Sequence, residues 1–218
     1  MVSPGVVVVR LFELAATAEF WRSVLFSFAR IVSGFLLAGV AGVLLAALAA
    51  RFRRVGELLV PVILAIKATP VASIIILILI WVSSRNLSVL ISFLMVLPVI
   101  YTNVLDGIRD TDKGLLEMAE LFQIPVRKRI LYIYISQVLP FFRSACSVAL
   151  GMCWKAGVAA EVIGVPDGSI GEKLYKAKIY LNTSDLFAWT LTIIVISVIF
   201  EYVFMLIIRR SIRCLERL

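Results

Sequence analysis

The chain has 218 residues, of which 62% are hydrophobic and only 17% are charged, and its formal net charge is +8. Soluble domains carry roughly a quarter charged residues, so this composition excludes an ordinary soluble domain and indicates a polytopic membrane protein. The basic residues cluster beside apolar runs, a pattern that orients membrane spans rather than one that binds nucleic acid. The sequence has no histidine, which excludes a Ser-His-Asp triad and a histidine-liganded zinc site.

Five apolar segments are long enough to cross a bilayer, for which about 20 residues suffice. They lie at about residues 21–50, 58–82, 87–104, 140–163 and 186–208. The predicted fold is therefore all-α, with one transmembrane domain over residues 1–218. A charged loop at 109–139 and a hairpin at 164–185 are predicted on opposite sides of the membrane.

Basic residues gather on one side of these segments. That side receives twelve basic residues: Arg51, Arg53, Arg54, Arg109, Lys113, Arg127, Lys128, Arg129, Arg209, Arg210, Arg213 and Arg217. The other side receives six: Arg10, Arg22, Arg85, Lys173, Lys176 and Lys178. Cytoplasmic loops are enriched in Lys and Arg, so we predict that this side and the carboxyl terminus are cytoplasmic and that the amino terminus is outside. An external start without a leading span is unusual, which raises the question of an upstream helix outside this sequence.

The first segment repeats small residues at Gly34, Ala38, Gly42 and Ala46. Residues four positions apart share one face of a helix, and small side chains let the backbone of a neighbouring helix come close. We therefore predict a helix-packing face. The alternative is that these residues face lipid, since Gly is common in membrane spans.

The second segment contains Lys67 and Pro70. A proline inside a helix removes one backbone hydrogen bond and bends the helix, and the freed carbonyl groups need other partners. A lysine at this depth is costly unless it reaches the interface or faces a polar interior. We predict a bent segment that lines a solute pathway, with snorkelling of Lys67 as the alternative.

A charged module at residues 117–140 interrupts the apolar sequence. Apolar positions at helical spacing predict an amphipathic helix over about residues 113–122. These positions are Leu115, Met118, Ala119 and Phe122. Glu117 and Glu120 lie away from that stripe, and Pro125 suits the first position of a second helix. The alternative is an interfacial helix that lies on lipid.

The module resembles the EAA loop of ABC-importer permeases, in which a Glu-Ala-Ala sequence is followed by a glycine and later by Leu-Pro. Glu117 and Ala119 match the glutamate and the second alanine, and residues 139–140 match the closing Leu-Pro. Three positions depart from the pattern: Met118 replaces the first alanine, Gln123 the glycine and Ser136 an earlier proline.

The resemblance covers most of the chain and is closest to the nitrate/sulfonate/taurine branch of the family. The matching segments are Lys67-Ala-Thr-Pro70, Asn103-x-x-Asp106-Gly107, Trp154-Lys155 with Ala160-Glu161, and Gly168-x-x-Gly171. It implies the type I ABC importer permease fold, with five transmembrane helices and a cytoplasmic coupling helix.

The same resemblance implies partners and a mechanism. Two copies, or this chain and a paralogue, would form the pathway in a bacterial or archaeal plasma membrane. Separate ABC ATPase subunits, which bind ATP and Mg²⁺, would grip the cytoplasmic loop, and an external binding protein would deliver the solute. The solute would be a nitrate-, sulfonate- or taurine-like anion or a heteroaromatic vitamin precursor, moved by alternating access. No cofactor and no catalytic residue is implied in this chain.

Site residues follow from the resemblance together with the local patterns. The ATPase-coupling candidates are Glu117, Ala119, Glu120, Gln123 and Pro125, and the pathway candidates are Lys67, Pro70, Trp154, Lys155 and Glu161. Glu161 is expected to help form the external mouth, since a charge within a span needs a polar surrounding. In the hairpin we predict a short helix over 172–181, whose basic residues Lys173, Lys176 and Lys178 face the binding protein.

Two other functions stay open. One is an ATP-independent carrier or channel. The other is a membrane lipid-phosphate transferase, because Asp106, Asp110 and Asp112 could hold Mg²⁺. Asp110 and Asp112 also suit the amino end of the amphipathic helix, where negative charge is favoured, and no other metal site is expected.

Overall fold

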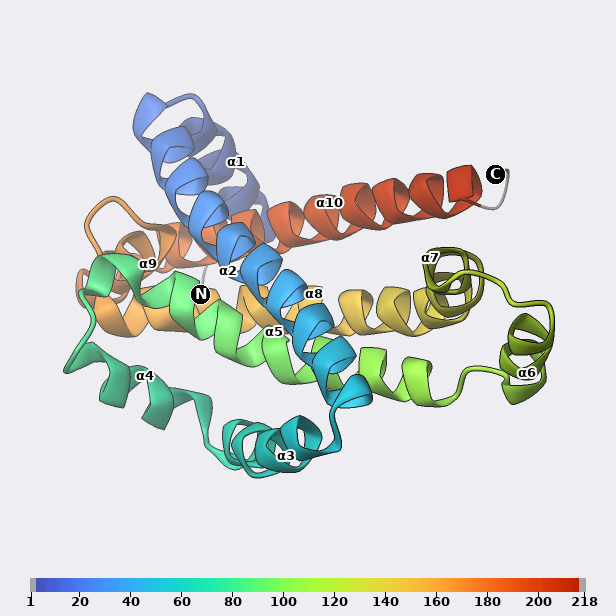
Figure 1. Cartoon of the computed structure of the whole chain (residues 1–218). Coiled ribbons are helices and arrows are strands. Elements are labelled where there is room, and N and C mark those ends of the chain that lie inside the picture. The colour runs from blue at the N-terminus through green and yellow to red at the C-terminus, as the bar shows by residue number, and fades with distance from the viewer. Residues whose placement is uncertain (1–2, 216–218) are drawn as a thin grey trace.

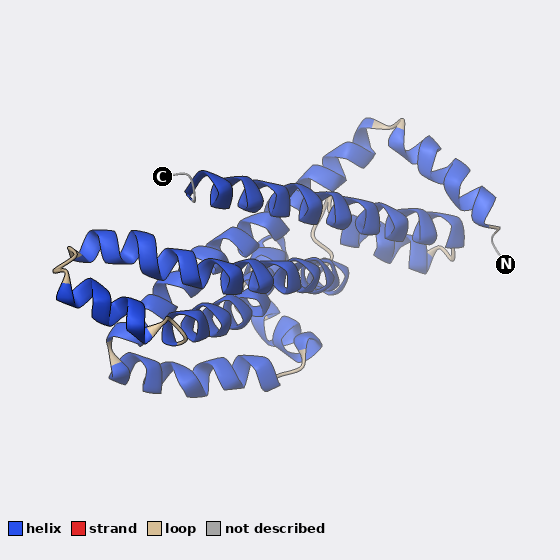
Figure 2. Ribbon diagram, turned by 90° about the vertical axis from the view of Figure 1, so that its right-hand side faces the viewer, coloured by secondary structure: helices blue, strands red, loops and turns tan. Residues whose placement is uncertain are grey.

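The structure is a computed structural model that describes residues 3–215, with side chains described as far as residue 210. Every regular element in that range is a helix (Figure 2), so the predicted all-α fold is confirmed. In chain order the elements are α1 (Pro4–Ala15), α2 (Ala18–Arg51), α3 (Arg53–Ala68), α4 (Val71–Leu79), α5 (Ser84–Arg109), α6 (Lys113–Leu121), α7 (Val126–Arg129), the π-helix η1 (Ile130–Tyr134), α8 (Ile135–Gly164), α9 (Ile170–Ile179) and α10 (Thr183–Leu215).

Helix α5 is the centre of the bundle, and α2 crosses it obliquely while running in the same chain direction (Figure 1). The two helices touch along the small-residue face of α2. A Cβ atom added at Gly34 would lie 2.4 Å from a backbone carbonyl oxygen of α5, and one added at Gly42 would lie 3.0 Å from an isoleucine side chain of α5. Ala38 and Ala46, on the same face, are fully buried. These small side chains allow the close approach of the two backbones.

Helix α8 packs antiparallel against another face of α5. Near one end of this contact, a Cβ atom at Gly157 would lie 2.7 Å from the Ser92 hydroxyl. Near the other end, a Cβ atom at Gly107 would lie 2.9 Å from the Phe141 ring. The three helices α2, α5 and α8 therefore enclose most of the hydrophobic core.

Helices α3 and α4 form one bent unit. The helix stops at Thr69, which has an extended backbone, and resumes after Pro70, with a bend of 101° between the two parts. The predicted bend is confirmed, and its cause is local, because proline restricts the residue before it and lacks an N–H. Helix α3 borders the carboxyl-terminal part of α5, whereas Ile75 of α4 packs with Leu87 and Ile91 near the amino-terminal part. The pair therefore crosses the bundle as one broken span.

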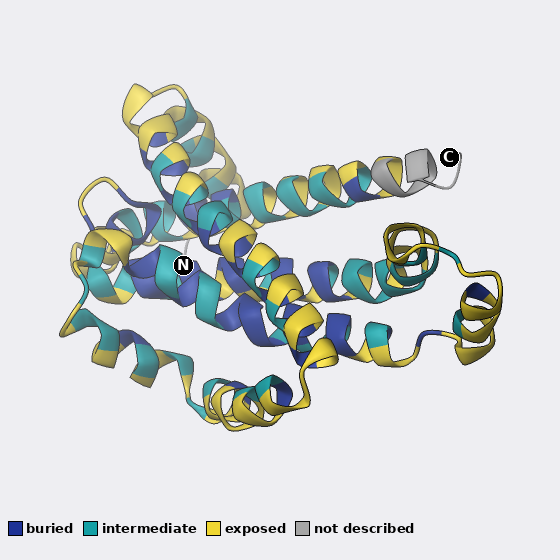
Figure 3. Ribbon diagram, in the orientation of Figure 1, coloured by how far each residue is buried: buried dark blue, intermediate teal, exposed yellow. Residues whose placement is uncertain are grey.

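Four helices of the described chain are long and apolar enough to cross a membrane, and the bent pair is a fifth candidate. The outer surface of the bundle is correspondingly apolar, because only 11% of the apolar window of α10 and 33% of that of α2 are buried. Figure 3 shows α10 mostly as intermediate or exposed residues. An apolar surface of this extent is not left in water. Lipid or other subunits must cover it.

The helix after α6 is longer than the sequence predicts. Val126–Gly164 forms one continuous helical stretch that includes α7, η1 and α8, whereas the predicted fourth span starts only at Pro140. Pro140 is accommodated inside α8, just after the π-helix, where the regular hydrogen-bond pattern is already altered. The second half of the predicted loop 109–139 is thus an extension of a membrane helix.

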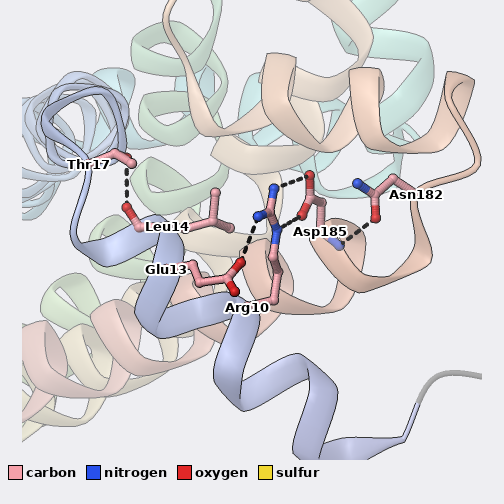
Figure 4. A network of polar contacts seen from close by, with 6 residues as sticks. All are labelled: Arg10, Glu13, Leu14, Thr17, Asn182 and Asp185. Carbon is pink, nitrogen blue, oxygen red and sulfur yellow. Dashed lines mark hydrogen bonds and ion pairs between the residues drawn. The ribbon is translucent and has the colours of Figure 1, made fainter.

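Helix α1 has no counterpart among the predicted elements. Its sequence is apolar and β-branched, but Pro4 occupies the first helical position, which suits proline. The helix packs against the start of α10, where Arg10 binds Asp185 (Figure 4). Leu11 and Leu14 contribute to a small core with Trp189.

Candidate functional site

The bundle has two ends at which functional residues gather (Figure 1). Helix α6 and its flanking turns lie at one end, which we call the α6 end. Helix α9 lies at the opposite end, which we call the α9 end.

Local sequence defines both ends of α6. Asp112 is the N-cap, since its Oδ1 accepts a hydrogen bond from the Gly114 N–H at 2.7 Å. At the other end Gln123 has φ +49°, and the Ile124 N–H donates to the carbonyl oxygen of Ala119 at 2.9 Å. This is the hydrogen-bond pattern of a helix that ends at a left-handed residue, usually glycine. Gln123 therefore makes the turn for which the EAA pattern has a glycine.

Helix α6 is fastened to the long helix that follows it. The Asp112 N–H donates to the Gln137 Oε1 at 2.9 Å, and Arg129 Nη2 reaches the carbonyl oxygen of Ala119 at 3.5 Å. Ala119 is fully buried beneath these contacts. Since Gln137 lies in α8, a displacement of α6 would be passed to a membrane-spanning helix.

The remaining surface of α6 is open. Of the predicted coupling residues, Glu117, Glu120, Gln123 and Pro125 are exposed and only Ala119 is buried. Leu121 and Phe122 are 83% and 75% exposed, although Phe122 belongs to the stripe that was predicted to pack. Helix α6 therefore leaves apolar and acidic side chains exposed on its surface.

A groove of about 600 Å³ lies at the α6 end, between the end of α2, helix α3 and the end of α5. Lys67 lines this groove together with Tyr101 and Arg109. The Tyr101 hydroxyl is buried and has no hydrogen-bond partner in the described part of the chain. Pro70 is exposed at the start of α4 and does not line the groove.

The predicted pathway residues of α8 face different surroundings. Lys155 is exposed, on the same face as the exposed Val148 and Met152. Trp154 is only 3% exposed, and its ring lies 6.0 Å from that of Phe28 and 6.3 Å from that of Phe200. Trp154 therefore does not line an open pathway in this conformation, because aromatic residues of α2 and α10 cover it.

Glu161 is also enclosed rather than placed at an open mouth, with 0% of its surface exposed. Its Oε2 accepts hydrogen bonds from the Ser27 hydroxyl of α2 at 2.6 Å and from the Gly171 N–H of α9 at 3.3 Å. The Ser27 Oγ in turn accepts from the Ile170 N–H at 2.9 Å. One carboxylate oxygen thus joins α8, α2 and the amino end of α9. Sequence reasoning placed Glu161 outside because it could not see α9 fold back over it.

The amino end of α9 carries a capping arrangement that the sequence analysis missed. The Ser169 Oγ accepts from the Glu172 N–H at 2.9 Å, and the Glu172 Oε2 accepts from the Gly168 N–H at 2.6 Å. The sequence signal for it is Ser-x-x-Glu. Helix α9 begins at Ile170, two residues before the predicted start.

The lysines of α9 form a weaker basic surface than predicted. Lys173 pairs with Glu19 of α2, and Lys176 pairs with Glu172 at 2.5 Å. Among the described residues only Lys178 of the three lacks an ion-pair partner. Their charge is largely neutralised within the chain.

The three aspartates of the alternative lipid-phosphate site do not come together. The described residues contain no group of three or more His, Cys, Asp or Glu side chains arranged to hold a metal ion. Asp112 caps α6, and Asp106 lines the groove beside Arg109. The geometry therefore gives no support to a transferase site.

Apolar spans around a central helix, with an exposed amphipathic helix fixed to one of them, define a polytopic membrane protein. The chain belongs to the family of binding-protein-dependent transport system inner membrane components, which matches residues 24–215.

Named relatives agree with this assignment. The chain is 27% identical to the protein named as aliphatic sulfonates transport permease SsuC of Bacillus subtilis over 188 residues, covering 85% of this chain and 67% of the relative. It is 28% identical to SsuC of Escherichia coli over 182 residues, covering 83% and 69%. It is 26% identical to the nitrate import permease protein NrtB of Synechococcus elongatus over 155 residues, covering 71% and 55%. The chain is thus an ABC-importer permease of the nitrate/sulfonate branch.

Proposed function

We propose that this permease moves a small anion into the cytoplasm by alternating access, driven by a separate ATPase that binds the α6 end. ATP and Mg²⁺ would be held by that ATPase, and no cofactor by this chain. The observation that carries the proposal is the exposed face of α6, which is tied through Asp112 and Gln137 to a membrane helix. ATP can shift the permease between two states only if the ATPase contacts differ between them, and α6 supplies such a contact.

The distribution of paired and unpaired charge supports a cytoplasmic α6 end. Of the ion pairs among the described residues, only Arg53–Glu57 lies at the α6 end. At the α9 end, Arg10, Lys173 and Lys176 are each paired with an acidic residue. Cytoplasmic loops carry an excess of Lys and Arg, and Arg51, Arg53, Arg54, Arg109 and Lys113 gather at the α6 end, so α9 would face outward toward a solute-binding protein. The amino terminus would then lie outside and the carboxyl terminus inside. The terminal residues themselves are outside the part of the chain that the structure describes.

An anionic solute is supported by the relatives, which are named for sulfonates, nitrate and bicarbonate, and by two basic residues. Lys67 lines the groove at the α6 end, and Lys155 lies on an exposed, otherwise apolar face of α8. A lysine at membrane depth faces water, a partner or a polar interior because lipid contact is costly. We infer that both lysines attract the solute along the pathway.

A second permease subunit, either another copy or a paralogue, would complete the pathway. The exposed apolar face of α8 beside Lys155 is continuous along Val148, Met152 and Ile163. A single chain leaves this face uncovered. A partner subunit would cover the apolar rows and leave the lysine facing the shared pathway.

The experiment is to reconstitute the permease with a candidate ATPase and binding protein in proteoliposomes and to measure solute-stimulated ATP hydrolysis. Glu117→Lys should abolish stimulation, because it reverses an exposed charge on α6. Asp167→Lys is the matched control, since it makes the same charge reversal at an exposed position at the α9 end, and it should retain binding of the ATPase and the basal, solute-independent hydrolysis that Glu117→Lys changes.

Normal stimulation in Glu117→Lys would remove α6 as the ATPase contact. Solute uptake without any ATPase would instead support the alternative of an ATP-independent carrier or channel. Loss of the complex in both variants would show that the charge reversals damage folding, and Glu117→Gln would then replace Glu117→Lys in the same comparison.

A further inference from the structure

We propose that the groove at the α6 end is a binding site for a short organic anion, which has an acidic group at one end and a few carbon atoms behind it. Arg51 and Arg109 bind the acidic group, and an apolar part of α3 covers the carbon body. The inference rests on the proposed function, because it assigns the groove to the solute and selects one class among the anions for which the relatives are named.

Helix α3 turns one face toward the groove along its whole length. Residues at three- and four-residue spacing share a helix face, and those of α3 that line the groove include Arg53, Glu57, Val60, Ile63, Leu64 and Lys67. This face is charged at both ends and apolar between them. Ile63 is buried, whereas Val60 and Leu64 are 52% and 59% exposed. The middle of the groove therefore offers uncovered apolar side chains to a ligand.

The groove carries more positive than negative charge. Arg53 and Glu57 neutralise each other through an ion pair of 2.8 Å. Four other charged residues line the groove: Arg51, Lys67, Arg109 and the single acidic residue Asp106. None of these four belongs to an ion pair among the described residues. Guanidinium groups without a carboxylate partner suit an acidic ligand, to which arginine can donate two parallel hydrogen bonds.

The unpaired basic residues lie at opposite ends of the groove. Arg51 ends α2 and Arg109 ends α5, so both lie at the outer opening. Lys67 lies near the other end of α3, about 20 Å from its start at 1.5 Å per residue. An anion that enters from the α6 end thus meets the arginines first, and its body then lies on Val60 and Leu64.

The size and the wall of the groove favour an organic anion over a bare oxyanion. Its volume of about 600 Å³ falls within the range of sites that hold organic ligands, roughly 300–1,000 Å³. Nitrate or bicarbonate would reach the arginines but would leave Val60 and Leu64 in water. A hydrocarbon body would cover these side chains and add the favourable free energy of burying apolar surface. The groove therefore suits an organic sulfonate or carboxylate.

Lys67 limits the length of the carbon body and argues against a phospholipid. A phospholipid would place its phosphate at the arginines, since basic pockets between membrane helices on the cytoplasmic side bind anionic headgroups. Its acyl chains would then run along α3 and cover Lys67, and a charge held in hydrocarbon is costly. A body of a few carbon atoms ends before Lys67 and leaves it hydrated.

The test is equilibrium binding to the purified chain in phosphatidylcholine nanodiscs, with pentane-1-sulfonate and nitrate as probes. Pentane-1-sulfonate should bind about tenfold more tightly or better, because each buried methylene strengthens binding about fourfold. Arg109→Gln should weaken its binding about tenfold, the order expected for a hydrogen bond to a charged group. Arg54→Gln is the control, since Arg54 is exposed beside the groove but does not line it, and binding should not change.

Two exposed leucines of α3 test the apolar wall. Leu64 lines the groove, whereas Leu58 is exposed elsewhere on the helix. Leu64→Ser should weaken pentane-1-sulfonate binding about fivefold and leave nitrate binding unchanged, because only the carbon body loses a contact. Leu58→Ser should change neither. Equal losses for both probes in Leu64→Ser would overturn the organic body, and so would nitrate that binds as tightly as pentane-1-sulfonate.

Unchanged pentane-1-sulfonate binding in Arg109→Gln would overturn the site itself. If Arg109→Gln does not fold, as judged by its circular dichroism, Arg51→Gln makes the same test at the same opening. Mass spectrometry of the chain purified from phosphatidylglycerol membranes distinguishes a lipid. Retention of that lipid by the native chain and Arg54→Gln but not by Arg109→Gln would show a headgroup in the groove and overturn the soluble anion. Equal retention by all three would support it.

These measurements need neither ATPase nor binding protein. Failure of the proposed function would therefore appear in the ATP hydrolysis assay while anion binding stands. Failure of the groove as a site would appear as lost probe specificity while solute-stimulated hydrolysis stands.

Discussion

Arg10 and Asp185, 175 positions apart in the sequence, form an ion pair with an Nε–Oδ1 distance of 2.5 Å that ties α1 to the first turn of α10 (Figure 4). Arg10 Nη1 also binds Glu13 Oε2 at 2.8 Å within α1. The pKa of Arg10 lies above its usual value, first because of the hydrogen bond to Asp185 and then because of that to Glu13. Arg10 is thus charged at every accessible pH, and its pairing places α1.

We predict that Asp185→Asn loosens α1 without unfolding the bundle. The pair is partly exposed, so the free energy of unfolding should fall by about 1 kcal/mol or less. Amide exchange of residues 4–15 should rise several-fold. Glu13→Gln removes only the contact within α1 and should have little effect on this exchange. Equal exchange in Asp185→Asn and the native chain would show that the apolar contacts alone hold α1.

The close contact between α2 and α5 predicts that a Gly→Ala substitution changes the free energy of unfolding in opposite directions at two positions of α2. Gly34→Ala brings a Cβ against a backbone carbonyl of α5, so the helices must separate, and we expect the free energy of unfolding to fall by roughly 1–3 kcal/mol. Gly39→Ala, in the same helix, meets nothing within 4 Å and should be neutral or stabilising by up to about 1 kcal/mol. Denaturation in mixed detergent micelles measures both. Equal effects would mean that the close approach is absent.

The turn after α6 predicts that restoring glycine stabilises it. Gln123 has φ +49°, a conformation that costs a residue with a Cβ roughly 1–2 kcal/mol. Gln123→Gly should therefore increase the protection of the α6 amides from exchange. Gln123→Asn should increase protection by less than glycine does, since asparagine tolerates this conformation, and Gln123→Val should reduce protection. If Gln123→Gly instead decreased the protection of the α6 amides, the backbone at Gln123 would not be strained.

The Glu172 carboxyl predicts a pH dependence for the α9 end. Burial acts to raise its pKa, but hydrogen bonds from Lys176 and the Gly168 N–H outweigh burial, and the pKa lies below its usual value. The stabilisation is complete above the ordinary carboxyl pKa of about 4.3 and is lost as the pH falls through the lower folded-state value. The melting temperature of Glu172→Gln should thus lie below that of the native chain at pH 6, with the gap narrowing as the pH falls below the ordinary carboxyl pKa. Asp167→Asn, at an exposed site, should show no such gap.

Features that depend on neighbours in the sequence could be predicted. The apolar segments follow from composition, because a bilayer needs about 20 apolar residues in a row. Pro70 bends its span because the restriction lies in its own ring and in the residue before it. Helix α6 follows from helical spacing around Ala119 and a cap at Asp112.

Features that depend on contacts between residues far apart in the sequence could not be predicted. The same local rules that located the bend at Pro70 placed the start of a segment at Pro140, whereas the helix runs without a break from Val126 through Pro140. The Val-rich α1 has weak helical signals of its own, and it is held by Asp185 from the far end of the sequence.

The sequence by itself determined the membrane class, the family and the exposed charge of α6, because these are properties of composition, spacing and local pattern. Only the tertiary structure decided that Trp154 and Glu161 are enclosed. In the sequence Glu161 is a charge near the end of a span, where either a water-filled mouth or a buried partner could satisfy it. In the structure a buried partner satisfies Glu161, because Ser27 packs against it and α9 folds back onto α8. These partners lie close to Glu161 in space but belong to other helices, so the local sequence does not reveal them.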